Sequence, residues 1–180
     1  MEKLINNELT DKNTTHSYLA TYERLFAPFK DTAKNILEIG VWKGGSIKLW
    51  SDYFSNATVY AVDIMEPPPY LIGYPRVLCY GADAYGAPFL NFMKTKKLDI
   101  IIDDGPHTLE SMCFTAKHYS ELLTENGILV IEDVQDIEWC NKIKESLPEN
   151  LKQFAYVVDL REEKVRYDDI LFIVQKNVDI

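Results

Sequence analysis

The sequence predicts an α/β domain with a doubly wound, mostly parallel sheet. Strand-like apolar runs alternate along the chain with stretches whose apolar residues have helical spacing, a pattern typical of that architecture. Two of the runs end in acidic pairs, Asp103-Asp104 and Glu132-Asp133. About two dozen residues separate these pairs, which is enough for a crossover helix between neighbouring parallel strands. With 180 residues, the chain is long enough for one domain with a substantial core.

Five apolar runs are expected to form the parallel strands, and three segments the helices between them. The predicted strands are residues 35–41, 58–64, 77–80, 98–103 and 127–132. The predicted helices are residues 46–54, 88–95 and 109–123. Thr108 is placed as the N-cap of the last helix, where Ser111 is not expected to complete a capping box.

The pattern changes near the C-terminus. Residues 154–160 and 170–175 are rich in β-forming side chains, and the polar connection between them is not expected to contain a helix. These two runs should therefore form an antiparallel hairpin at the sheet edge. Residues 1–33 are predicted as a helical segment before the first strand, and residues 34–180 as the core of the same single domain.

Charge and cysteine content narrow the class of protein. The formal net charge of −9 argues against a nucleic-acid backbone or an anionic membrane as the main partner. The three cysteines are widely spaced and odd in number, as expected for reduced thiols of an intracellular protein. No signal peptide or membrane span is visible in the first residues. We therefore expect a cytoplasmic protein.

The first predicted strand runs into a glycine-rich turn and then into a helix. Glu38 lies in the strand, and Gly40 and Gly44 have the spacing Gly-x-x-x-Gly before the helix begins at Ser46. Glycine allows a positive φ and a close approach of the backbone to a ligand, and the first N–H groups of a helix can bind a carboxylate or a phosphate. A tight turn without a ligand is the alternative interpretation.

The next two predicted strands also end in acid. Asp63 follows the glycines by about twenty residues, where a carboxylate can accept hydrogen bonds from both ribose hydroxyls of an adenosine. Asp83 can accept a hydrogen bond from an adenine amino group, and Ile64 and Tyr85 are candidate apolar walls for the base. Either aspartate can instead be a turn former or a helix cap.

A second acidic group is expected where the fourth and fifth strands end. If these strands are neighbours, Asp104, Glu132, Asp133 and the imidazole of His107 meet at the carboxyl edge of the sheet. Hard oxygen ligands suit a divalent cation such as Mg²⁺, and a neutral histidine can accept a proton. Helix capping by Glu132-Asp133 and a structural role for His107 are the alternatives.

In their order and spacing, these residues resemble the class I S-adenosylmethionine-dependent methyltransferases over nearly the whole chain. The resemblance implies a Rossmann-like, seven-stranded sheet of order 3-2-1-4-5-7-6 whose last strand is antiparallel. The implied donor site consists of Glu38, Gly40, Gly44, Ser46, Asp63, Ile64, Asp83 and Asp103. Glu38 and Gly40 would serve the methionine end of the donor. Asp63 would serve its ribose and Asp83 its adenine.

The acidic group is similar to that of the metal-dependent sugar O-methyltransferases of macrolide pathways, of the macrocin and mycinamicin type, and of the cephalosporin hydroxylase-like family. The shared segments are residues 103–107, residues 131–133 and the opening Thr10-Asp11-Lys12 with His16, Tyr18 and Tyr22. This resemblance implies Mg²⁺ or another divalent cation on Asp104, Glu132 and Asp133. It implies His107 as the catalytic base, although Pro106 stands where that family usually has serine.

We therefore expect an S-adenosylmethionine-dependent, Mg²⁺-dependent O-methyltransferase that acts on a sugar hydroxyl, in a nucleotide-linked sugar or a glycan. Homo-oligomers are compatible with the resemblance. The alternatives are a metal-independent small-molecule methyltransferase with the same donor site and a non-catalytic, nucleoside-binding partner protein of the same fold. His16, Tyr18 and Tyr22 are expected either to cover the donor as a lid or to be aromatic core residues.

Overall fold

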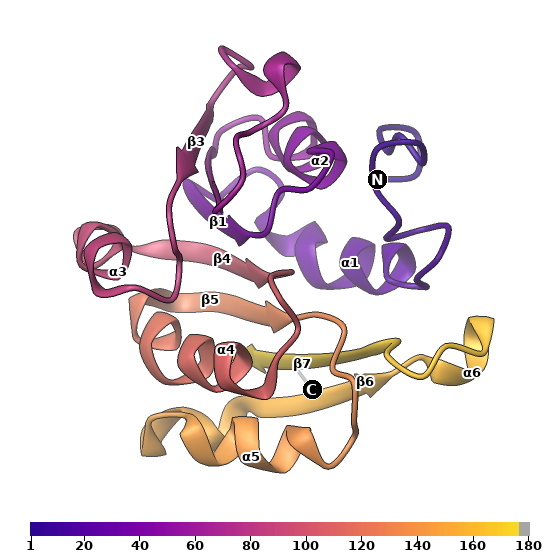
Figure 1. Cartoon of the computed structure of the whole chain (residues 1–180), viewed down its shortest axis with the longest axis vertical. Coiled ribbons are helices and arrows are strands. Elements are labelled where there is room, and N and C mark those ends of the chain that lie inside the picture. The colour runs from indigo at the N-terminus through magenta and orange to yellow at the C-terminus, as the bar shows by residue number, and fades with distance from the viewer. Residues whose placement is uncertain (177–180) are drawn as a thin grey trace.

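A seven-stranded sheet crosses the part of the chain that the structure describes, residues 1–176 of the computed structural model (Figure 1). The strand order is β3-β2-β1-β4-β5-β7-β6. Neighbours are parallel from β3 to β5, whereas β7 is antiparallel to both β5 and β6. The predicted fold class and the C-terminal hairpin are confirmed.

Each predicted strand is present, with ends that differ by a few residues. The strands are β1 (Asn35–Ile39), β2 (Thr58–Asp63), β3 (Val77–Gly81), β4 (Leu98–Asp103), β5 (Leu123–Ile131), β6 (Ala155–Asp159) and β7 (Ile170–Gln175). β5 begins earlier than predicted because Leu123 already pairs with Leu98 of β4, before an irregularity in the ladder.

The helices differ more from the prediction. They are α1 (Leu19–Phe26), α2 (Gly45–Tyr53), α3 (Ala87–Met93), α4 (Leu109–Phe114), α5 (Trp139–Ser146) and α6 (Arg161–Lys164), with 3₁₀ turns at Ala27–Phe29, Pro69–Leu71, Ser120–Leu122 and Glu149–Phe154. The predicted helix 109–123 is interrupted, since α4 passes into a π-helical turn, Thr115–Tyr119. Helix α5 was not predicted; it buries only Cys140 and Ile143, so its apolar pattern is weak.

Two local predictions were wrong. The connection between β6 and β7 does contain a helix, the single turn α6, which ends where Val165 adopts a left-handed φ of 56°. Ser111 does complete a capping box: its Oγ accepts a hydrogen bond from Thr108 N at 3.2 Å, and its N donates to Thr108 Oγ1 at 3.1 Å. A serine hydroxyl therefore takes the place of the longer Glu or Gln of the usual box.

The sheet separates two apolar layers, because successive side chains of a strand point to opposite faces. Ile36 packs in the layer that contains α1 and α2, whereas Leu37 packs in the layer that contains α3, α4 and α5. Both side chains are fully buried. Burial on both faces explains why the central strands are continuous apolar runs in the sequence. None of the helices in residues 1–176 is long and apolar enough to cross a membrane.

The segment before β1 is helical only in its second half. α1 and the 3₁₀ turn after it cover residues 19–29, whereas residues 1–18 form a series of turns. Leu9 O accepts a hydrogen bond from Gly45 N at 3.2 Å, which ties these turns to the start of α2. Lys164 Nζ donates to His16 O at 2.6 Å and to Asn13 O at 2.7 Å, which ties them to α6. We call residues 9–18 the N-terminal strap.

Gly40 brings the end of β1 against the end of β4. Its φ is +94°, and a Cβ atom built on it would lie 2.0 Å from the carbonyl oxygen of Asp104. Asp104 N donates to Ile39 O at 2.8 Å, so the two turns are held in contact. A glycine is required here both by the backbone angle and by the lack of space.

We expect Gly40→Ala to lower the free energy of unfolding by about 3 kcal/mol or more, because it adds a backbone collision to the cost of a positive φ. Gly73→Ala is the matched control, since Gly73 has a φ of +77° but no atom within 4 Å of the position that a methyl group would take, and should cost about 1–2 kcal/mol. Urea unfolding of both variants measures the difference. Equal losses would contradict the role of close packing.

Candidate active site

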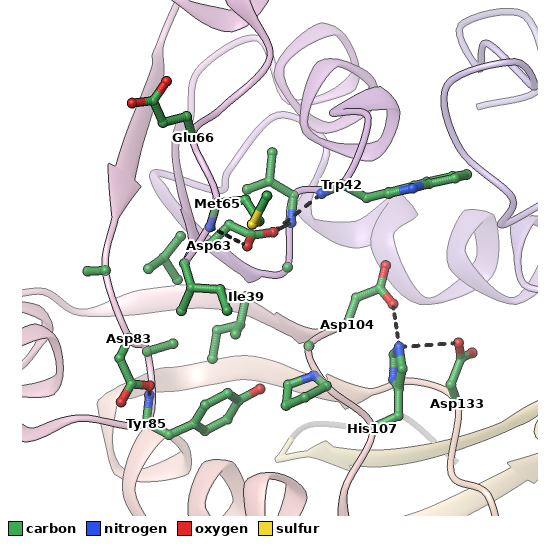
Figure 2. A pocket seen from close by; sticks show the side chains of 18 of the residues that line it. Ile39, Trp42, Asp63, Met65, Glu66, Asp83, Tyr85, Asp104, His107 and Asp133 are labelled. Atoms are coloured by element: carbon green, nitrogen blue, oxygen red, sulfur yellow. Dashed lines mark hydrogen bonds and ion pairs between the residues drawn. The ribbon is translucent and has the colours of Figure 1, made fainter.

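A cavity of about 740 Å³ opens at the carboxyl edge of the sheet (Figure 2). The predicted site residues that line it are Gly40, Asp63, Ile64, Asp83, Asp104, His107 and Asp133. The predicted site residues that do not line it are Glu38, Gly44, Ser46, Asp103 and Glu132. Asp83 and Tyr85 stand at one end, and His107 and Asp133 at the other. The two acidic groups predicted from the sequence therefore share one cavity.

Asp63 lies at the end of β2 and organises the glycine-rich turn. Its Oδ2 accepts hydrogen bonds from Val41 N at 2.8 Å and from Trp42 N at 3.4 Å, and its Oδ1 accepts one from Met65 N at 2.9 Å. The carboxylate still faces the cavity. Asp63 is thus both a structural part of the turn and an acceptor available to a ligand.

Asp103, the last residue of β4, holds Tyr85 of the cavity wall in place. Its carboxylate accepts hydrogen bonds from Tyr85 OH at 2.6 Å and from Thr115 Oγ1 at 2.5 Å. Burial raises the pKa of Asp103 to about 6, while these hydrogen bonds oppose the rise. Tyr85 lines the cavity, so Asp103 reaches this space through the tyrosine that it holds.

Glu38, at the end of β1, is buried under the cavity floor. Its Oε2 accepts a hydrogen bond from Trp50 Nε1 at 2.5 Å, and burial raises its pKa to about 7. Gly44 has a φ of +78° and precedes α2, and Ser46 lies buried in the first turn of that helix. The assignment of Glu38, Gly44 and Ser46 to the donor site stays a prediction.

Asp104, His107 and Asp133 form an outer group that opens into the cavity. His107 Nε2 lies 3.8 Å from Asp104 Oδ1 and 3.7 Å from Asp133 Oδ2 (Figure 2). One potential ligand atom from each residue lies within 4.8 Å of the other two. His107 and Asp133 adopt left-handed φ values of 53° and 54°, which are strained for side chains of this kind. The two carboxylates at this spacing suit a divalent cation, and the imidazole lies beside them.

Asp104 also belongs to an inner group with Glu38 and Glu132, and a lysine stands in the middle of it. Lys12 Nζ lies 2.7 Å from Asp104 Oδ2 and 2.6 Å from Glu132 Oε1, and Glu38 Oε1 is 3.6 Å away. Burial lowers the pKa of Lys12, but the three carboxylates outweigh it and raise the value well above that of a free lysine. Lys12 is therefore a buried ammonium ion.

Aromatic residues of the strap and of α1 also contact the acidic groups at the carboxyl edge of the sheet. Tyr22 OH donates to Glu132 Oε1 at 2.5 Å, and Tyr18 OH donates to Asp133 Oδ1 at 2.6 Å. Both tyrosines are fully buried. His16 Nδ1 lies 3.1 Å from Asp169 Oδ1, beside the start of β7. These residues pack as core aromatics and contact the acidic groups; whether the strap moves as a lid stays a prediction.

The role of Lys12 was missed from the sequence. Thr10-Asp11-Lys12 contributes there only to a family resemblance, and no residue is assigned to balance the acids. Lys12 is 92 residues from Asp104 and 120 from Glu132, so no local spacing connects them. A signal is present in the charges, since several carboxylates predicted to meet away from water need a cation.

Comparison with curated proteins identifies homologues. The chain is 34% identical over 139 residues to 8-demethyl-8-alpha-L-rhamnosyl tetracenomycin-C 2'-O-methyltransferase of Streptomyces olivaceus, covering 72% of this chain and 36% of that protein. It is 28% identical over 133 residues to mycinamicin VI 2''-O-methyltransferase of Micromonospora griseorubida, covering 69% and 33%. The chain thus spans about a third of the length of these relatives. No family model matches the chain.

Solved structures give the class of the fold. MycE methyltransferase of the mycinamycin biosynthetic pathway, in complex with Mg, SAH and mycinamycin VI, superposes with a TM-score of 0.71 at 21% identity, over 91% of this chain and 50% of that one. The strand order is that of the class I S-adenosylmethionine-dependent methyltransferase fold. Within that class, the chain is a homologue of the sugar O-methyltransferases of the macrocin, mycinamicin and tetracenomycin type.

Proposed function

We propose that this protein is a Mg²⁺-dependent O-methyltransferase that transfers the methyl group of S-adenosylmethionine to a sugar hydroxyl. The observation that carries the proposal is the shared cavity, which joins a nucleoside-type site at Asp63 and Asp83 to the cation-type outer group at Asp104, His107 and Asp133. The homologues support the reaction, since their names describe O-methyl transfer, and two of the names contain a sugar group, rhamnosyl or olivosyl.

The donor would lie along the ends of β1, β2 and β3. Asp63 accepts the ribose hydroxyls, and Asp83 accepts the adenine amino group beside Tyr85 and Ile64. Gly40 lines the cavity after β1, so the methionine end would lie against its backbone. The sulfonium methyl group would then lie between the nucleoside end of the cavity and the outer group.

The outer group fits a divalent cation by its donor chemistry. Asp104 and Asp133 would hold it, since carboxylate oxygens are the ligands that Mg²⁺ prefers. When bound, the cation supplies a positive charge that lowers the pKa of a neighbouring hydroxyl. Glu132, the third predicted ligand, has both carboxylate oxygens engaged by Lys12 and Tyr22. It would join the set only if Lys12 withdrew.

His107 would take the proton of the acceptor. In methyl transfer, a new O–C bond forms as the C–S bond breaks, the electron pair stays on sulfur to give S-adenosylhomocysteine, and the hydroxyl proton must leave. His107 lines the cavity, with its Nε2 atom between Asp104 and Asp133, and a neutral imidazole in this position can accept a proton. Near-attack positioning of donor and acceptor can supply roughly 7–11 kcal/mol of the barrier reduction.

One observation favours the metal-independent alternative. Lys12 already neutralises part of the acidic edge with a positive charge from the chain itself. A methyltransferase with this donor site could then position its acceptor through Asp104 and His107 alone. Metal binding therefore decides between the two hypotheses.

Asp63→Ala should weaken the binding of S-adenosylhomocysteine about 100-fold, because two hydrogen bonds from the ribose to a carboxylate are lost. Calorimetry measures the dissociation constant. Asp52→Ala, a change of a carboxylate that pairs with Lys48 away from the cavity, is the control and should leave the affinity unchanged. If both variants bind the nucleoside like the natural sequence, the donor site is misplaced.

Asp133→Asn should abolish the binding of Mg²⁺ to protein saturated with S-adenosylhomocysteine, because it removes one of two anionic ligands. Titration calorimetry gives the affinity, and Asp136→Asn, at an exposed position three residues further along the chain, should retain it. A chain of natural sequence that takes up no Mg²⁺ would support the metal-independent hypothesis instead.

His107→Asn should reduce methyl transfer by at least about 100-fold while leaving nucleoside and Mg²⁺ binding intact. Asparagine tolerates the left-handed backbone of this position but cannot accept the proton. Formation of S-adenosylhomocysteine with methyl α-L-rhamnopyranoside as the acceptor probe measures turnover. His118→Asn, at a ring that packs on Phe114 outside the cavity, is the control. Full activity in the His107 variant would exclude the role of base.

A further inference from the structure

We propose that Lys12 is a positioning residue that fills the inner acidic group as a built-in counter-ion and thereby confines a divalent cation to the outer group. The inner group is Glu38, Asp104 and Glu132, and the outer group is Asp104, His107 and Asp133. The inference deepens the proposed function, since it states where at this edge a metal can bind and which residue decides it.

The ammonium group of Lys12 lies among the three carboxylates of the inner group. These carboxylates come from the ends of β1, β4 and β5, which are consecutive in the sheet. Lys12 Nζ donates to Asp104 Oδ2 at 2.7 Å and to the two oxygens of Glu132 at 2.6 and 2.7 Å. The Lys12 side chain is 1% exposed, so this charge is held without water. The three donors of an ammonium ion are thereby used.

A divalent cation and this ammonium ion cannot occupy the inner group together. A cation such as Mg²⁺ or Mn²⁺ needs carboxylate oxygens at about 2.0–2.2 Å, in the space where Nζ now stands. Glu38 Oε1 is buried, points into this group and has no hydrogen-bond partner among the described residues. The inner group is thus a set of cation ligands that the chain itself has filled, with one acceptor left over.

Asp104 connects the two groups and is oriented by Lys12. Its Oδ2 accepts the hydrogen bond from the lysine, so its Oδ1 is the oxygen nearer to His107, at 3.8 Å from Nε2. The carboxylate is therefore presented to the cavity in one orientation. Lys12 acts on the outer site through Asp104, without contact with the cavity.

The strap is anchored by hydrogen bonds both before and after Lys12 in the sequence. Gly45 N binds Leu9 O on the side before the lysine, and Lys164 binds His16 O on the side after it. Ser17 N donates to Asp169 Oδ2 at 3.2 Å, next to the start of β7. Lys12 is therefore part of a docked segment and not a mobile surface side chain.

The test counts bound Mn²⁺ ions, by the electron paramagnetic resonance signal of free Mn²⁺ in equilibrium with the protein. Lys12→Met keeps the apolar length of the side chain and removes the charge. We expect this variant to bind one more Mn²⁺ ion per chain than the natural sequence does, and the double variant Lys12→Met, Glu132→Gln to lose the additional ion. Lys43→Met, an exposed lysine near Trp42, is the control and should not change the count.

Glu132→Gln alone keeps Lys12 and should leave the number and affinity of bound Mn²⁺ ions unchanged, because Glu132 is not a ligand while the lysine is in place. This variant tests the inference even if Lys12→Met fails to fold. An unchanged count in a folded Lys12→Met variant, or a loss of Mn²⁺ on Glu132→Gln alone, would overturn the role of Lys12.

The outcomes separate this inference from the proposed function. If the natural sequence binds no Mn²⁺ and Lys12→Met binds one ion, the metal-dependent function fails while the role of Lys12 stands. If the natural sequence binds Mn²⁺ and Lys12→Met binds it with the same count, the role of Lys12 fails while the function stands. Absence of binding in both proteins contradicts both.

Discussion

The repulsion between carboxylates at one edge of the sheet is the constraint on which the site depends. Parallel strands that end in acid bring Glu38, Asp104, Glu132 and Asp133 close together, in part away from water. Such a group is strongly unfavourable unless cations or donated hydrogen bonds compensate for it. The ammonium ion of Lys12 and the phenol hydroxyls of Tyr18 and Tyr22 compensate for the repulsion, and all three residues precede the first strand.

The carboxylates are not compensated to the same degree, and this difference distinguishes acids with a structural role from acids that remain available to a ligand. Glu132 accepts hydrogen bonds from Lys12 and Tyr22, so its carboxylate is engaged within the protein. Asp133 receives one from Tyr18 and keeps its other oxygen toward His107. Glu132 is thus engaged by residues of the chain, while Asp133 at the cavity retains an acceptor position that a ligand can reach.

The succession of strands and the edge at which the acids meet were predictable from apolar periodicity and from the rule that ligands bind at the carboxyl ends of parallel strands. The sheet order was implied only by the resemblance to the class I methyltransferases. Strand alternation also explains why Asp103 turns away from the cavity while Asp104 faces it. The partner of the acids was not predictable in this way, since Lys12 reaches them only through tertiary folding. Helix α5 was not predicted because it buries only Cys140 and Ile143, which leaves a weak apolar pattern in the sequence.

The strap's connections also have a consequence for the order of folding. During synthesis Lys12 leaves the ribosome long before Glu132, and His16 long before Asp169, from which 153 residues separate it. Contacts of such high sequence separation form late, because the chain between them must first be ordered. Until then, the acids of the growing sheet lack their counter-ion. The active edge is therefore expected to be the last part of the domain to become native.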